Sequence, residues 1–186
     1  VYGDVKEEMT PPSDPSYREP RGLGFVIRAY VDSDHAGNSV TRRSRTGFVV
    51  LLNKALIYWF SKKQMSIETS SFGSEFIAMK QCCEYLRGLR IKLRYMGIPV
   101  DLPCFVFGDN KSVLSNSSVP QSVLKKKSNS IAYHFVREGC AKDEWCIAYV
   151  NTHDNCADLL TKPLVGMKRR KFTNMLLYHV YTYEGD

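Results

Sequence analysis

The feature that most constrains the fold is a short apolar run that ends in a carboxylate and passes directly into a helix, at residues 104–114. Residues 105–107 have the length and the β-propensity of a buried strand. Gly108 allows the backbone to turn, so Asp109 lies at the carboxyl end of that strand, where open α/β sheets place their ligands. Aspartate is also a good helix cap, and this position alone leaves both interpretations open.

Composition indicates one globular domain with a polyanionic partner. The 186 residues suffice for one hydrophobic core, and 44% hydrophobic with 24% charged residues is ordinary for a globular protein. No apolar run approaches the ~20 residues of a membrane span, so we expect no membrane partner. The net charge of +7 favours nucleic acid, although solubility alone would also explain it. Because the chain begins with Val1 rather than Met, we expect it to be part of a longer protein.

The six cysteines indicate free thiols rather than disulfides. Cys82 and Cys83 are adjacent, and no C-x-x-C pair occurs, which also argues against a structural zinc site. We therefore expect an intracellular protein.

The chain divides into three segments. Residues 1–22 are polar and contain four prolines, which is typical of a linker or extended arm. Residues 23–165 form the predicted domain, and residues 166–186 a basic helical extension whose apolar face packs on the domain or on a missing neighbour.

The pattern of the domain predicts an α/β fold with a five-stranded mixed sheet. Three antiparallel strands are expected first, the second and third joined by a hairpin at residues 53–54. A helix capped by Ser70 or Ser71 follows and ends at Gly97. Later strands are expected at residues 105–107 and 145–150. A helix is expected over residues 128–138, with Ile131, His134 and Phe135 on its inner face, and a further helix is expected after the last strand, capped by Asp154 and containing Asp158.

Glu75 lies on the apolar stripe of the first helix, one turn before Met79. A carboxylate on a core-facing stripe is costly unless a cation compensates it. The alternative is an acid favoured by the helix dipole. A capping box is excluded, because Phe72 stands where Ser or Thr is needed.

Two further carboxylates follow the same logic. Asp32 ends the first strand, and Asp158 lies in the first turns of the helix after the last strand, where the helix dipole alone could favour it. If the first and fourth strands are neighbours, Asp32, Asp109 and Glu75 meet at one edge. Such like charges need cations between them, and hard oxygen ligands select Mg²⁺ or Mn²⁺. Two such ions ~3.5–4 Å apart are the device of phosphodiester hydrolysis.

The order of elements and these four carboxylates resemble the ribonuclease H fold and its catalytic set. Seven motifs in order resemble the ribonuclease H domain that follows the reverse transcriptase in copia-type LTR-retrotransposon polyproteins, at residues 30–37, 46–48, 59–64, 70–78, 108–112, 133–138 and 157–164. The resemblance covers roughly residues 25–165.

The resemblance implies metal-dependent endonucleolytic cleavage of the RNA strand of an RNA–DNA hybrid by two Mg²⁺ or Mn²⁺ ions. The implied partners are the hybrid and the reverse transcriptase domain of the same polyprotein, and the implied location is a cytoplasmic particle or the nucleus. Asp32, Glu75, Asp109 and Asp158 would be the catalytic and metal-binding residues, with His153 in proton transfer or product release. An A-like hybrid is recognised through its backbone and 2′-hydroxyls.

Nucleic-acid contacts are expected from Ser71 and Asn110 and from a run of three lysines, Lys125, Lys126 and Lys127, which could equally be a solvated loop. The sequence departs from the family at several positions. Asp34 competes with Asp32 as first ligand, but the Tyr-Val-Asp pattern favours Asp32. His35 stands where the family has Trp, and residues 72–75 keep only the second of two usual acids.

Two rival functions stay open. One is an inactive remnant that only binds or tethers nucleic acid, against which the four intact acids argue. The other is an integrase- or resolvase-type nuclease of the same fold that cuts DNA, against which the copia-like motifs and the lack of a zinc-binding segment argue. Preference for hybrid over duplex DNA would decide the second.

Overall fold

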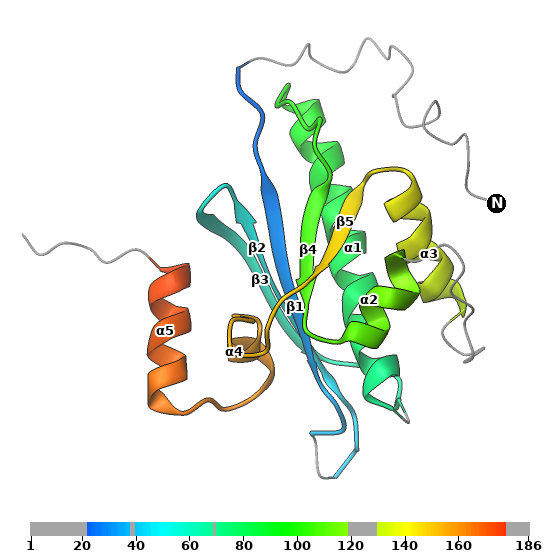
Figure 1. The fold of residues 1–186 in the computed structure, drawn as a ribbon, viewed down its shortest axis with the longest axis vertical. Helices are drawn as coiled ribbons and strands as arrows, with labels where there is room; N and C mark the ends of the chain where they lie inside the picture. Colours follow the sequence, from blue (N-terminus) through cyan, green and yellow to red (C-terminus); the bar gives the residue numbers. More distant parts are fainter. Residues whose placement is uncertain (1–21, 38–39, 69, 119–129, 178–186) are drawn as a thin grey trace, which may run out of the picture.

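The computed structural model describes residues 22–37, 40–68, 70–118 and 130–177, except for the side chains of residues 116–118. Its centre is a five-stranded mixed sheet in the order β3-β2-β1-β4-β5 (Figure 1). The strands are β1 (Ile27–Asp34), β2 (Arg45–Leu52), β3 (Ala55–Lys63), β4 (Cys104–Gly108) and β5 (Trp145–Tyr149). The helices are α1 (Ser71–Tyr95), α2 (Lys111–Ser118), α3 (Ser130–Ala141), α4 (Asp158–Thr161) and α5 (Gly166–Leu176). The predicted fold class is confirmed.

The strand pairing brings two predicted carboxylates to one edge. β1 pairs antiparallel with β2, and β2 with β3, through the hairpin at Asn53, whose φ of 55° suits a tight turn. On its other side β1 pairs parallel with β4, from Arg28 opposite Phe105 to Tyr30 opposite Phe107. The carboxyl ends of β1 and β4 therefore meet at the same edge of the sheet.

Helix α1 crosses one face of this sheet. The Ser70 hydroxyl accepts a hydrogen bond from the Gly73 N–H, 3.3 Å away, which satisfies an otherwise unpaired donor of the first turn. The helix ends before Gly97, which takes a φ of 75°. Its stripe of Met79, Cys82, Leu86 and Leu93 is buried in the main hydrophobic core, together with residues of α2 and α3.

The opposite face of the sheet is covered by α4 and α5 (Figure 1). A second core lies here, in which Phe172 and Leu176 of α5 pack with Val49 and Leu51 of β2 and with Cys156. The apolar face of α5 thus packs on the domain itself, which is one of the two partners predicted for it.

Two local predictions were wrong. Of the three residues predicted to face inward from α3, Ile131 is 83% exposed and His134 is exposed as well, whereas Phe135 is half-buried and packs against the core. The buried side chains of this helix include Tyr133 and Val136 instead. The buried face is set by α1, against which Tyr133 packs through Phe76, with ring centroids 6.1 Å apart.

Asp154 does not cap the last helix of the domain. α4 is a single turn with Ala157 at its N-cap position, and Asp154 forms an ion pair with Lys171 of α5, with Nζ and Oδ1 2.5 Å apart. A nearby lysine on another element thus engages the carboxylate that the sequence offered as a cap.

The cysteines agree with the predicted thiols, because all six lie in the described ranges and none is in a disulfide. Burial raises the pKa of the Cys140 and Cys156 thiols to about 12, which keeps both protonated. Within the ranges described, no helix combines the length and the apolarity needed to cross a bilayer.

Candidate active site

Three carboxylates from three separate elements meet at the carboxyl edge of the sheet. Asp32 lies near the end of β1, Glu75 in the second turn of α1 and Asp109 directly after β4. Each offers an oxygen atom, and these oxygens all lie within 4.8 Å of one another. Asp32 is 1% exposed, and Glu75 and Asp109 are half-buried.

The start of α1 is tied to the sheet so that Glu75 points at this cluster. The Ser33 N–H donates to the Glu75 carboxylate, and the Ser33 hydroxyl donates to the Ser74 hydroxyl at 3.0 Å. The buried Gln64 amide donates both to the Ser74 carbonyl, at 2.8 Å, and to the Thr46 hydroxyl, at 3.1 Å. β1, β2 and the segment after β3 therefore fix the first turns of the helix.

Ionising all three carboxylates is unfavourable without a cation, because they are buried and repel one another. Burial and, next to it, the nearby charges of Asp32 and Asp109 together raise the pKa of Glu75 to about 9, against the opposing effects of Lys162 and of the Ser33 N–H. Burial also raises the pKa of Asp32 to about 6, although a hydrogen bond from Thr161 and the charge of Lys162 oppose the shift. Three oxygen donors that repel one another in this way fit a hard divalent cation.

Asp158 is not a member of this three-carboxylate cluster. It is fully buried at the start of α4 and forms two ion pairs, from Oδ1 to Lys162 Nζ at 2.7 Å and from Oδ2 to Lys168 Nζ at 2.5 Å. Lys162 Nζ also lies 3.5 Å from Asp32 Oδ2, and the Thr161 hydroxyl donates to the same oxygen. Asp158 is therefore connected to the cluster through Lys162.

The buried side chain of Asn155 holds the start of α4 against β1. The Asn155 amide donates to the Val31 carbonyl of β1, 2.8 Å away, and its Oδ1 accepts from the Ala157 N–H at 3.2 Å. The loop before α4 is thereby tied to the residue that precedes Asp32 in the strand.

The other predicted site residues lie around the cluster. Asp34, the alternative to Asp32, points against the backbone of Gly37, where a Cβ atom would collide with its carboxylate. Asn110 Oδ1 accepts from the N–H groups of Ser112 and Val113, at 3.0 and 3.3 Å, and so caps α2. Ser71 is exposed at the start of α1.

His153 is exposed in the loop before α4, where its backbone N–H donates to Asn151 Oδ1 at 2.9 Å. Lys125, Lys126 and Lys127 lie outside the described residues.

A basic edge that sequence reasoning missed lies beside the cluster. Arg45 pairs with Asp34 across the β1–β2 ladder and with Lys63 across the β2–β3 ladder, and Lys62 lies one step along. Lys62 and Lys63 are exposed, and Arg45 donates to the Ser61 hydroxyl at 3.1 Å. The predicted hairpin contained this signal, because it folds residues 62–63 back beside residues 45–46, on the strand next to the one that carries Asp32.

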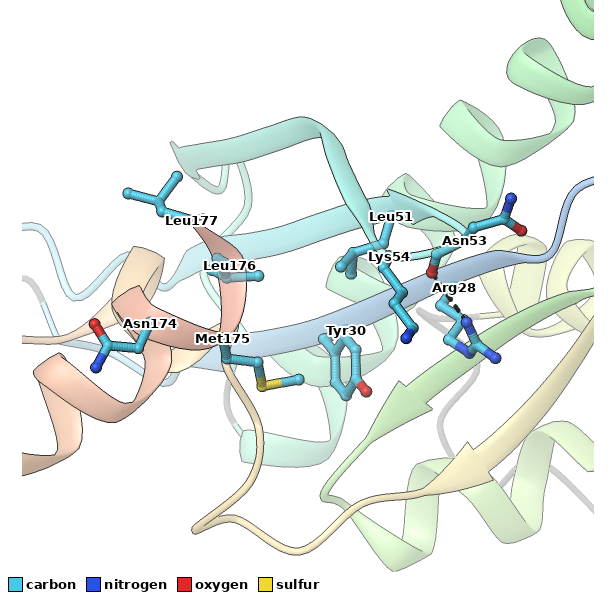
Figure 2. A pocket seen from close by; sticks show the side chains of 9 residues that line it. All are labelled: Arg28, Tyr30, Leu51, Asn53, Lys54, Asn174, Met175, Leu176 and Leu177. Atoms are coloured by element: carbon cyan, nitrogen blue, oxygen red, sulfur yellow. Dashed lines mark hydrogen bonds between the residues drawn. The ribbon is translucent and has the colours of Figure 1, made fainter. Parts of the chain in front are cut away.

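A separate pocket of about 300 Å³ opens between α5 and the sheet (Figure 2). Arg28 and Tyr30 of β1, Leu51 of β2 and Met175 of α5 are among its lining residues, and Arg28 donates to the Asn53 carbonyl at 3.0 Å. None of the clustered carboxylates lines this pocket, so it is distinct from the candidate active site.

The amino-acid sequence is similar to segments of transposon polyproteins. It is 29% identical over 156 residues to the retrovirus-related Pol polyprotein from transposon RE2 of Arabidopsis thaliana, and 31% identical over 156 residues to that from transposon RE1 of the same plant. Each match covers 84% of this chain and 11% of the polyprotein, so the chain spans about a tenth of the length of these relatives. No family model matches the chain.

The fold is similar to solved ribonuclease H structures. The ribonuclease H of Halobacterium salinarum superposes with a TM-score of 0.55 at 16% identity, over 73% of this chain and 93% of that one. A ribonuclease H from a compost metagenome, solved in complex with an RNA/DNA hybrid, gives a TM-score of 0.57 at 17% identity, over 73% and 93%. The chain therefore has a ribonuclease H-like fold, and its sequence is similar to a segment of the Pol polyproteins of copia-type retrotransposons.

Proposed function

We propose that this domain is a metal-dependent endonuclease that hydrolyses the RNA strand of RNA–DNA hybrids during the reverse transcription of a retrotransposon. The observation that carries the proposal is the convergence of Asp32, Glu75 and Asp109 within 4.8 Å in a ribonuclease H fold. The similarity to Pol polyproteins supports the retrotransposon context, with the reverse transcriptase domain of the same polyprotein as partner.

The chain's own residues would hold the cation and the substrate. Asp32, Glu75 and Asp109 would hold Mg²⁺ or Mn²⁺, because carboxylate oxygens are the donors that these ions prefer. A bound divalent cation would supply the Lewis acidity that phosphodiester hydrolysis requires. Cation binding requires that Glu75 lose its proton, so the raised pKa of about 9 makes the affinity for the cation increase with pH.

The basic edge offers a place for the backbone of the hybrid. Arg45 lies on β2 opposite Asp34, and Lys62 and Lys63 lie on β3, one strand further out, at the same end of the sheet as Asp32, so phosphates of a bound strand could contact them there. On the other side of the cluster, Lys111 lies over the half-exposed ring of Tyr149, with Nζ 5.2 Å from the ring centroid. Cations on both sides of a carboxylate cluster suit recognition through phosphates.

Cleavage of a labelled RNA–DNA hybrid tests this proposal. The whole chain would be incubated with hybrid and Mg²⁺, with hybrid and EDTA, and as the Asp109→Asn variant. Asp101→Asn is the matched control, because Asp101 is an exposed aspartate just before the same strand. We expect cleavage of the RNA strand that EDTA and Asp109→Asn abolish and that Asp101→Asn leaves unchanged.

Other outcomes would select the rival functions. Hybrid binding without cleavage, even after the polymerase domain is added, would favour an inactive binding module. Equal cleavage of duplex DNA would favour an integrase-type nuclease. Cleavage that survives Asp109→Asn would refute the proposed site.

A further inference from the structure

Lys162 takes a position between two carboxylates that the resemblance assigns to metal binding. Its Nζ lies 2.7 Å from Asp158 Oδ1 and 3.5 Å from Asp32 Oδ2. Both carboxylates are almost fully buried, with 1% and 0% exposure, whereas the lysine side chain is 37% exposed. A buried carboxylate without a partner is costly, so each of these two acids requires a nearby positive charge.

The lysine is held in this bridge from both sides. It follows Thr161, whose hydroxyl donates to Asp32, and it lies one helical turn after Asp158. Burial alone would lower the pKa of Lys162, but the hydrogen bond to Asp158 and the charges of Asp32 and Asp158 raise it, so the ammonium stays charged. Lys168 adds a second ammonium on the far oxygen of Asp158.

The charges of the four carboxylates and the two lysines favour the binding of one divalent cation over the binding of two. Asp32, Glu75, Asp109 and Asp158 carry four negative charges when all are ionised. The ammonium groups of Lys162 and Lys168 leave two of these charges, which one divalent cation balances. A second divalent cation would leave the site with an excess of positive charge and would have to displace the lysine bridge.

We propose that Lys162 is a positioning residue whose ammonium bridges Asp32 and Asp158 in place of a second divalent cation. In the absence of nucleic acid the domain then binds a single divalent cation, on Asp32, Glu75 and Asp109. This inference rests on the proposed function, because it concerns the same site. It assigns a role to the Thr-Lys pair of the 157–164 motif.

Counting bound Mn²⁺ tests the inference without measuring cleavage. Isothermal titration of the whole chain with Mn²⁺, together with electron paramagnetic resonance of the free ion, gives the number of ions bound. We expect one ion for the wild type and two for Lys162→Met, and a return to one for Lys162→Arg, which restores the charge. Lys168→Met is the matched control: it removes the same single charge but leaves the Lys162 ammonium between Asp32 and Asp158, so we expect one ion if the position of Lys162, rather than the net charge alone, limits binding.

The wild-type count alone can overturn the inference, so the test does not depend on the folding of a variant. Two ions bound to the wild type, or one ion bound to a folded Lys162→Met variant, would refute the role of Lys162 and leave the proposed nuclease standing. No ion bound to the wild type, or one ion that Asp109→Asn does not remove, would refute the proposed metal site as well. Circular dichroism establishes whether each variant is folded.

Discussion

The Glu75 carboxyl makes the stability of the metal-free domain depend on pH in an unusual direction. Its pKa of about 9 in the folded chain lies far above the ordinary value of 4.5. Between these two values the folded state holds a proton that the unfolded state has released. Stability from this group is therefore fully present at low pH and is lost as the pH rises toward 9.

The size of the effect follows from linkage. Each pH unit in this window costs ~1.4 kcal/mol when one proton separates the two states. From pH 6 to pH 8 the metal-free chain should therefore lose about 3 kcal/mol of unfolding free energy through Glu75. Glu75→Gln keeps the shape of the protonated carboxyl but has no proton to lose, so this loss should disappear.

Urea unfolding in EDTA at pH 6, 7 and 8 measures the effect. The matched control is Glu84→Gln on the same helix, where the carboxylate is 46% exposed and pairs with Lys80 at 2.6 Å. We expect the control to follow the wild type. Excess Mg²⁺ should flatten the dependence in the wild type, because the cation takes the place of the proton. Equal pH dependences for wild type and Glu75→Gln in EDTA would refute the reasoning.

Four further substitutions test the surroundings of the site. Gly47→Ala places a Cβ atom 2.6 Å from Thr161 Cγ2, so we expect the free energy of unfolding in urea to fall by ~1–3 kcal/mol. The control is Gly88→Ala, whose Cβ atom would meet no atom within 4 Å and which should be neutral or stabilising. An equal fall in both variants would contradict the argument. Asn155→Ala leaves the buried Val31 carbonyl without its donor, which should cost ~1–3 kcal/mol in the same assay. Lys62→Met and Lys63→Met should each weaken hybrid binding and lower the slope of log affinity against log salt by ~1 in filter binding. Unchanged slopes would remove the basic edge from the interface.

Local patterns sufficed for the parts of the fold that position the first three carboxylates. The period of α1 placed Glu75 on its inner stripe, because a 3.6-residue repeat fixes which side chains share a face. The positions of Asp32 and Asp109 followed from strand ends, and the parallel pairing of β1 with β4 turned these into neighbours. A short stretch of sequence therefore contained the position of each carboxylate, whereas the pairing of β1 with β4 is a long-range contact that the sequence analysis could state only as a condition.

The remaining features depend on tertiary contacts that no short stretch encodes. Ile131 has an apolar side chain on a helix, yet Tyr133 faces the core because the packing on Phe76 selects the other face. The lysine bridge was invisible for the same reason. Asp158 and Lys162 are one helical turn apart in sequence, but only the approach of α4 to β1 adds Asp32 as a third member.

The short helix α4 places several residues of the 157–164 motif beside Asp32 at once. A single turn is too short to be stable by itself, so its position must come from contacts with the sheet. Asn155 ties the segment before it to β1, and Gly47 of β2 lets it approach so closely that any larger residue would collide with Thr161. The same turn delivers Asp158, Thr161 and Lys162 to Asp32. The position of α4 therefore follows from the surface on which it packs. We expect a larger residue at Gly47 to displace Thr161, and with it the contacts to Asp32, although Gly47 has no side chain that could bind a cation.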